Sequence, residues 1–258
     1  MFKLRVAVLF LILSVVTITG CSLKKHFMQN EEENSSKTST ISGEKNTIAN
    51  KSGNDIVDYS IQVVSAPEAI PVLVNKVNKL PDSYTPTDLV NPNIPFTFTQ
   101  KSEKRKMRAK AAAAIEKLFA GAKQDGIDLL GVSAYRSHAA QTVLFNYYVS
   151  LDGYDTARTY SAIPGTSEHE TGLAIDVTGG DGKCAAEDCF AGTPEASWLE
   201  EHASDYGFII RYPQGKDSVT GYKYEPWHLR YVGKSIAKKI MNRGITLEEY
   251  LETTPVNN

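Results

Sequence analysis

The sequence predicts an α+β fold with a small, mostly antiparallel central sheet and flanking helices. Short apolar runs have the length of strands, and stretches rich in Ala, Lys and Glu have the length of helices. Their order lacks the regular alternation that produces a doubly wound parallel sheet. The 258 residues, 41% of them hydrophobic, suffice for one sizeable domain with an extension or for two small domains. The formal net charge of −2 gives no indication of nucleic-acid binding.

Residues 1–20 have the pattern of a secretory signal peptide. Two basic residues precede an apolar run over residues 6–18, which is short for a transmembrane helix. The segment Ile18-Thr19-Gly20-Cys21 then resembles a bacterial lipobox, so we expect Cys21 to be lipidated and to become the first mature residue. The alternatives are an uncleaved anchor and an ordinary signal peptide with an incidental cysteine. Each of them places the domain outside the cytoplasmic membrane.

Residues 21–58 are expected to form a disordered tether, and residues 59–258 the folded domain. The tether is rich in Ser, Thr, Asn, Lys and Glu and nearly free of aromatic residues, so it cannot bury enough apolar surface to fold. Apart from Cys21, the chain has two cysteines, Cys184 and Cys189. An extracytoplasmic location favours a disulfide between them. Free thiols are the alternative, and a C-x4-C pair without a nearby histidine is a poor metal ligand set.

The folded domain is expected to begin with extended chain and to continue with mixed helices and strands. Prolines between apolar residues favour an extended segment over residues 73–96. The clearest helix is predicted to begin after Ser102 and to end at Gly126. The later elements are a strand in 127–137, a helix in 138–153, a strand in 172–178, a helix in 193–207 capped by Thr193, strands in 208–213 and 221–233 (the latter interrupted by Pro226), and a helix in 233–244.

Asp176 is the residue that packing explains least. Strand alternation places Leu173, Ile175 and Val177 on one face of the segment and Ala174 and Asp176 on the other. A buried carboxylate requires a cation, a metal ion or several hydrogen bonds. Asp176 is therefore a candidate functional residue.

Two histidines are candidate partners for Asp176. His169 lies seven residues earlier, across Gly172, which allows the chain to turn back. His228 lies 52 residues later, in another strand-like segment. Two imidazoles and one carboxylate match a catalytic zinc site whose fourth position is open to water. The alternative is a pair of structural histidines with an aspartate that caps a turn or binds an arginine.

Glu225 and Arg136 are the candidate catalytic residues. Glu225 lies three residues before His228, and a carboxylate near an activated water can accept its proton and pass it to a leaving amine. Arg136 lies where a strand-like run turns into a helix, and it can stabilise an oxyanion or bind a carboxylate. The alternatives are a surface strand residue for Glu225 and a solvated or capping role for Arg136. Trp227 is expected in the core.

Three segments, in this order, resemble the VanY-type D-alanyl-D-alanine carboxypeptidases, which are zinc peptidases that share a fold with the VanX dipeptidases and the hedgehog signalling domain. The segments are SAYRS with the following Gln141, PGTSEHETGLAIDV, and EPWHLRYVG. The likeness covers roughly residues 72–244. It implies that the zinc ligands are His169, Asp176 and His228. It also implies that Glu225 is the catalytic base and Arg136 the transition-state arginine. The implied substrate contacts are Arg136, Gln141 and Ser167.

The resemblance implies a carboxypeptidase with one Zn²⁺ per chain that removes the C-terminal D-alanine from peptidoglycan stem peptides. The protein would be lipid-anchored to the outer face of the cell membrane. The rivals are an L,D-carboxypeptidase acting on tetrapeptide stems, a dipeptidase or endopeptidase of the same fold, and a non-catalytic, zinc-stabilised wall-binding lipoprotein. Glu225 argues against the last, because a structural site needs no acid beside an open metal position. Glu168 and Glu170 are expected to be solvated.

Overall fold

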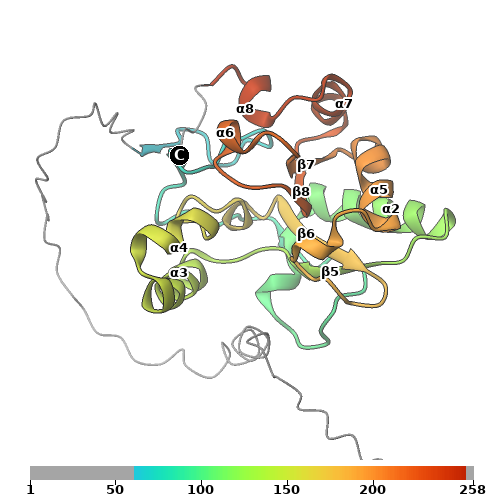
Figure 1. The fold of residues 1–258 in the computed structure, drawn as a ribbon, viewed down its shortest axis with the longest axis horizontal. Helices are drawn as coiled ribbons and strands as arrows, with labels where there is room; N and C mark the ends of the chain where they lie inside the picture. Colours follow the sequence, from blue (N-terminus) through green and yellow to red (C-terminus); the bar gives the residue numbers. More distant parts are fainter. Residues whose placement is uncertain (1–60, 254–258) are drawn as a thin grey trace, which may run out of the picture. The chain divides into compact units, whose positions relative to one another are not determined.

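A computed structural model describes residues 61–253, and the expectations for the signal peptide, for lipidation of Cys21 and for the tether lie outside this range. A four-stranded sheet with the order β5–β6–β8–β7 occupies the centre, and each neighbouring pair is antiparallel (Figure 1). Its strands are β5 (Leu129–Ser133), β6 (Ala174–Gly179), β7 (Phe208–Tyr212) and β8 (Glu225–Tyr231). The expected fold class is therefore confirmed.

Two smaller pairings lie in the extended N-terminal part of the described chain. The first is parallel and the second antiparallel. They join β1 (Gln62–Val63) to β2 (Asn78–Lys79) and β3 (Leu89–Val90) to β4 (Met107–Arg108). Apart from isolated bridges of Asn75 to Asn78 and of Phe96 to Gly131, the rest of residues 73–96 is turns and irregular chain, as the prolines of this segment predict.

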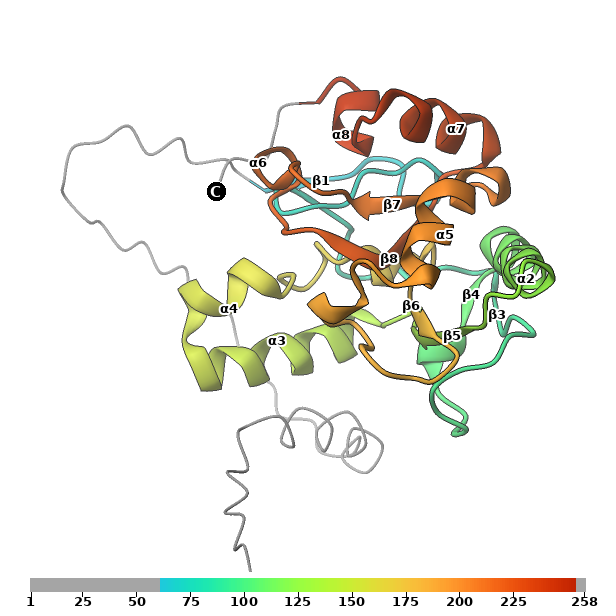
Figure 2. The same cartoon turned by 45° about the vertical axis from the view of Figure 1, so that its right-hand side comes forward.

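Helices flank the sheet, with α3 and α4 side by side at one end and α2 at the other (Figures 1 and 2). The α-helices are α2 (Ala109–Gln124), α3 (His138–Asp152), α4 (Tyr154–Tyr160), α5 (Pro194–His202), α6 (Asp217–Thr220), α7 (Lys234–Arg243) and α8 (Leu247–Tyr250). The 3-10 helices are η1 (Glu103–Arg105), η2 (Glu168–Thr171), η3 (Asp188–Phe190) and η4 (Ala203–Tyr206). Within residues 61–253, none of these helices has the length and apolarity needed to span a bilayer.

The main hydrophobic core lies against one face of the central sheet. The predicted alternation in β6 is confirmed, since Leu173, Ile175 and Val177 are fully buried in this core. Trp227 also packs there, as expected. Asp176 is buried as well, but on the opposite face of β6, where the apolar packing that anchors the strand leaves its carboxylate directed away from the core.

The first long helix begins later than predicted. Residues 103–105 form η1, and the chain then extends through β4 before α2 begins at Ala109. Met107 is fully buried, and the Arg108 side chain donates to Asp88 at 2.8 Å. These tertiary contacts favour strand pairing over the helix that local propensity predicts. The helix ends close to the predicted Gly126, because α2 stops at Gln124 and Gly126 has φ +80°.

The later elements lie near their predicted ranges, with two differences. Thr193 caps α5 by accepting from the amide of Ala196, but the α-helix ends at His202 and η4 completes the segment. β8 begins at Glu225, later than predicted, and its pairing with β7 is irregular at Pro226, because Ile210 pairs with Leu229 and Tyr212 pairs with Glu225. The sequence pattern also missed α4, α6 and α8.

Cys184 and Cys189 form a disulfide, the pairing that the sequence favours over free thiols or a metal pair. The short loop that it closes carries Asp188, whose carboxylate binds the Lys223 ammonium at 2.6 Å. The loop is therefore tied to the segment that leads into β8.

Candidate active site

Three strands of the central sheet direct polar side chains to one face. Asp176 in β6 lies opposite His228 in β8 and opposite Ser133 in β5. Directly opposed residues in antiparallel strands project their side chains to the same side of the sheet. The register of three strands therefore brings the predicted aspartate and the second predicted histidine together, across 52 residues of sequence.

The turn after η2 brings His169 to the same place. Gly172 ends this helix in the left-handed region with φ +66°. A Cβ at this position would lie 2.8 Å from Leu89 Cδ2, so both the backbone conformation and the space favour glycine. The chain then enters β6, and His169 Nε2 lies 3.3 Å from Asp176 Oδ2.

His169, Asp176 and His228 form a buried cluster with the donor set of a metal site. One ligand atom from each of the three residues lies within 4.8 Å of the others. His169 Nδ1 lies 2.7 Å from the Ala134 carbonyl oxygen, to which its N–H donates, and this leaves the lone pair of Nε2 toward the cluster. His228 Nδ1 lies 2.9 Å from Asp176 Oδ1. Two imidazoles and one carboxylate fit a catalytic zinc site with an open fourth position.

The charges in this cluster favour capture of a cation. Burial by itself would raise the pKa of Asp176, but His169 and His228 hold it well below its usual range, so the carboxylate is ionised. Burial lowers the pKa of His169. Burial also acts to lower the pKa of His228, but the neighbouring carboxylates of Asp176 and Glu168 prevail and raise it to about 9. An imidazole binds a metal ion only through a nitrogen without a proton, so Nδ1 of His228 has to be free of its proton in a metal-bound state.

Glu225 begins β8 and lies at the margin of the cluster. It is half-buried and lines a pocket of 490 Å³ together with Thr159, Tyr160, Asp217, Gly221, Tyr222, Lys223 and Tyr224. Burial raises the pKa of Glu225 to about 7, the Asp176 carboxylate adds to this effect, and His228 opposes it. A carboxyl group with a pKa near neutrality can both accept and donate a proton at physiological pH.

Arg136 lies beside this face of the sheet. Its guanidinium donates to Gln141 Oε1 at 2.9 Å and to Ser133 Oγ at 3.4 Å, and its backbone amide donates to the His169 carbonyl. Gln141 in turn donates to the Ala162 carbonyl at 2.7 Å. Arg136 and Gln141 are thus one hydrogen-bonded unit, fixed next to the strand that carries Ser133.

Ser167 is buried and lies immediately before η2, next to the ligand segment. Its carbonyl accepts from the amide of Glu170 at 3.1 Å. The substrate-binding roles given to Ser167, Gln141 and Arg136 stay predictions, as do the roles of the cluster residues and Glu225.

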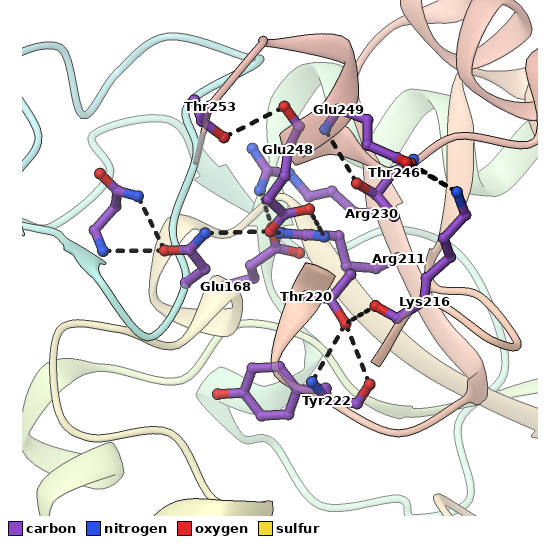
Figure 3. Close-up of polar contacts among 12 residues, drawn as sticks. Glu168, Arg211, Lys216, Thr220, Tyr222, Arg230, Thr246, Glu248, Glu249 and Thr253 are labelled. Carbon is purple, nitrogen blue, oxygen red and sulfur yellow. Dashed lines mark hydrogen bonds and ion pairs between the residues drawn. The ribbon is translucent and has the colours of Figure 1, made fainter. Parts of the chain in front are cut away.

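The expectation that Glu168 and Glu170 are solvated is wrong. The Glu168 side chain is fully buried, and its Oε1 accepts from Arg211 at 2.7 Å and from Arg230 at 2.5 Å (Figure 3). Glu170 is buried too, and it binds the Gly165 amide and His138 Nδ1. The burial of Glu168 could have been inferred from the sequence, because Arg211 and Arg230 lie inside apolar strands and buried arginines need anions nearby.

The chain matches the VanY family, described as D-alanyl-D-alanine carboxypeptidase, over residues 104–234. YodJ of Bacillus subtilis (strain 168), a carboxypeptidase by name, is 40% identical over 256 residues, which cover 93% of each chain. Among solved structures, the LD-carboxypeptidase LdcB, described for its peptidoglycan recognition, has a TM-score of 0.72 at 45% identity and covers 75% of this chain and 91% of its own.

A second solved structure is a zinc complex of a variant of the D,D-pentapeptidase VanY from a VanB-type resistance cassette. It has a TM-score of 0.58 at 32% identity and covers 70% of this chain and 98% of its own. The fold and the buried His–Asp–His cluster define a metallo-carboxypeptidase. The chain belongs to the VanY family, and its activity is that of a carboxypeptidase on peptidoglycan peptides.

Proposed function

We propose that the protein is a zinc-dependent L,D-carboxypeptidase, which removes the terminal D-alanine from tetrapeptide stems of peptidoglycan. The observation that carries this choice is the greater similarity to the LD-carboxypeptidase LdcB, at 45% identity, than to the D,D-pentapeptidase VanY, at 32%. The sequence motifs alone favour the D,D activity on pentapeptides, which is therefore the second candidate. The family description D-alanyl-D-alanine carboxypeptidase supports that second candidate.

One zinc ion per chain would be held by His169, Asp176 and His228. When bound, zinc lowers the pKa of water and polarises a peptide carbonyl. Glu225 accepts the proton of the attacking water and delivers it to the departing amine of D-alanine. The 490 Å³ pocket beside Glu225 offers room for the stem peptide.

Arg136 supplies the positive charge for this reaction. Its guanidinium donates to the developing oxyanion or to the terminal carboxylate of the substrate. Gln141 holds the guanidinium in place and, with Ser167, contacts the substrate end. Recognition of a terminal carboxylate limits cleavage to the last peptide bond.

The lipobox-like segment around Cys21 supports an anchored location for this activity. We place the protein on the outer face of the cell membrane, attached through a lipid on Cys21, with residues 21–58 as a tether. This arrangement would give the domain access to the stem peptides of the wall.

Digestion of defined stem peptides tests the proposed substrate. Purified protein is expected to remove one alanine from tetrapeptides and to leave pentapeptides intact, as measured by mass spectrometry. Lysine and diaminopimelate versions of each peptide cover the third position, and a chelator is expected to abolish the cleavage. Loss of alanine from pentapeptides alone would support the D,D-carboxypeptidase instead. Chelator-resistant cleavage would contradict the metal assignment.

Removal of one ligand tests the metal site. His169→Ala is expected to lose the bound zinc, because two remaining ligands do not hold the ion in a catalytic geometry. His202→Ala is the matched control, since His202 lies on α5 outside the cluster. Zinc content per chain is measured on both purified proteins. Equal zinc content in the two variants would sink the assigned ligand set.

A further inference from the structure

Glu168 lies between two buried arginines and the ligand His228. Its Oε1 accepts from both Arg211 and Arg230, while its Oε2 lies 3.5 Å from His228 Nε2. Glu168, Arg211 and Arg230 have side chains with 0% exposure. The carboxylate therefore has one oxygen fixed by two cations and a second oxygen directed at the imidazole.

The two facing atoms have no other partner. Glu168 Oε2 and His228 Nε2 are, with the Tyr84 hydroxyl, the buried side-chain polar atoms that lack a hydrogen bond within residues 61–253. A buried polar group without a partner is costly, so a small approach of these two atoms is favourable. On the other side of the ring, His228 Nδ1 faces Asp176 and the cluster. A proton on Nε2 would leave the Nδ1 lone pair free for a metal ion.

We infer that Glu168 is a positioning residue for the metal centre: it accepts a hydrogen bond from His228 Nε2 and so fixes the tautomer and the orientation of this ligand. The inference rests on the proposed function, because it takes His228 as a metal ligand. Arg211 and Arg230 hold the carboxylate in place through Oε1. The ligand is thereby coupled to a buried network that also contains Glu248 (Figure 3).

The competing interpretation is that Glu168 only compensates the charge of the arginines. Glu248 already binds Arg211 through two hydrogen bonds, at 2.9 and 2.6 Å. Arg230 donates its other hydrogens to the backbone carbonyls of Ile70, Val72 and Tyr231. Charge compensation therefore does not explain why one oxygen of Glu168 accepts both arginine donors while the other faces His228.

Glu168→Gln separates the two interpretations, with Glu248→Gln as the matched control. In Glu168→Gln the arginines retain the amide oxygen, so the NH₂ group faces His228 Nε2 and opposes a proton there. Glu248→Gln removes one charge from the same network without contacting His228. We expect zinc affinity, measured by chelator competition, to fall by about 10- to 100-fold in Glu168→Gln and by less than about threefold in Glu248→Gln.

Equal zinc affinities in the two variants would overturn the inference, and failure of the wild type to bind zinc would overturn the proposed function with it. A measurement on the unmodified protein covers the case in which Glu168→Gln does not fold. Imidazole ¹⁵N–¹H correlation spectra of the zinc-loaded wild type are expected to show the proton of His228 on Nε2. A proton on Nδ1 would contradict the inference.

Discussion

Glu225→Ala is expected to lower kcat for release of D-alanine by about 10²- to 10⁴-fold, the usual contribution of a general acid–base residue. Zinc content is expected to stay at the wild-type value, because Glu225 lies outside the cluster of candidate ligands. Together these two results would distinguish a catalytic metal site from a zinc-stabilised binding protein. Release of D-alanine and bound zinc are both measured on the purified variant.

Glu201→Ala is the matched control, since Glu201 is exposed on α5, and it is expected to turn over like the wild type. Wild-type rates in Glu225→Ala would rule out the assigned base. The pH profile gives a second readout. Burial raises the pKa of Glu225 to about 7, and protonated Glu225 cannot accept a proton. kcat/KM is therefore expected to fall toward acid, with the midpoint at or below this value because a bound cation lowers the pKa.

Arg211→Met is expected to lower the free energy of unfolding by about 3–5 kcal/mol, the usual cost of removing one partner from a buried ion pair. Arg211 is fully buried, and it supplies three hydrogen bonds to Glu168 and Glu248. Methionine fills similar space but leaves both carboxylates with fewer donors. Urea unfolding in the presence of a chelator measures the effect without a contribution from bound metal.

The control is Arg243→Met, on the exposed end of α7, and it is expected to change stability by less than about 0.5 kcal/mol. A comparable loss in both variants would contradict the importance of the buried network. Burial acts to raise the pKa of Glu168 and Glu248, but Arg211 holds both below their usual range. Their contribution to stability is thus complete at neutral pH and is lost as the pH falls through the lowered pKa values.

Local patterns in the sequence were sufficient to predict the strand that carries Asp176. The alternation of Leu173, Ile175 and Val177 predicts which face is buried, and the structure confirms it. The sequence also predicts the convergence of His169 and His228 on Asp176, because Gly172 allows a turn and the family motifs fix the order of the segments. These features depend on neighbours within a few residues or on a conspicuous motif.

The environment of Glu168 could not be predicted from its own segment, because its partners lie 43 and 62 residues away. Its neighbours are polar, so the local pattern indicates a solvated loop. The informative residues were Arg211 and Arg230, which interrupt apolar strands and need anions nearby. The late start of α2 has a similar origin, because pairing of residues 107–108 with residues 89–90 overrides the helix propensity.

The contacts of the buried arginines also show that the segment matching the family is shorter than the unit that has to fold. The family match covers residues 104–234, yet Arg230 donates to the carbonyls of Ile70 and Val72. Arg211 likewise depends on Glu248, which in turn accepts from Asn75. A fragment trimmed to the matched stretch would keep every candidate catalytic residue but leave two guanidinium groups short of partners. Independent folding of this domain therefore requires the chain that flanks the candidate catalytic residues on both sides.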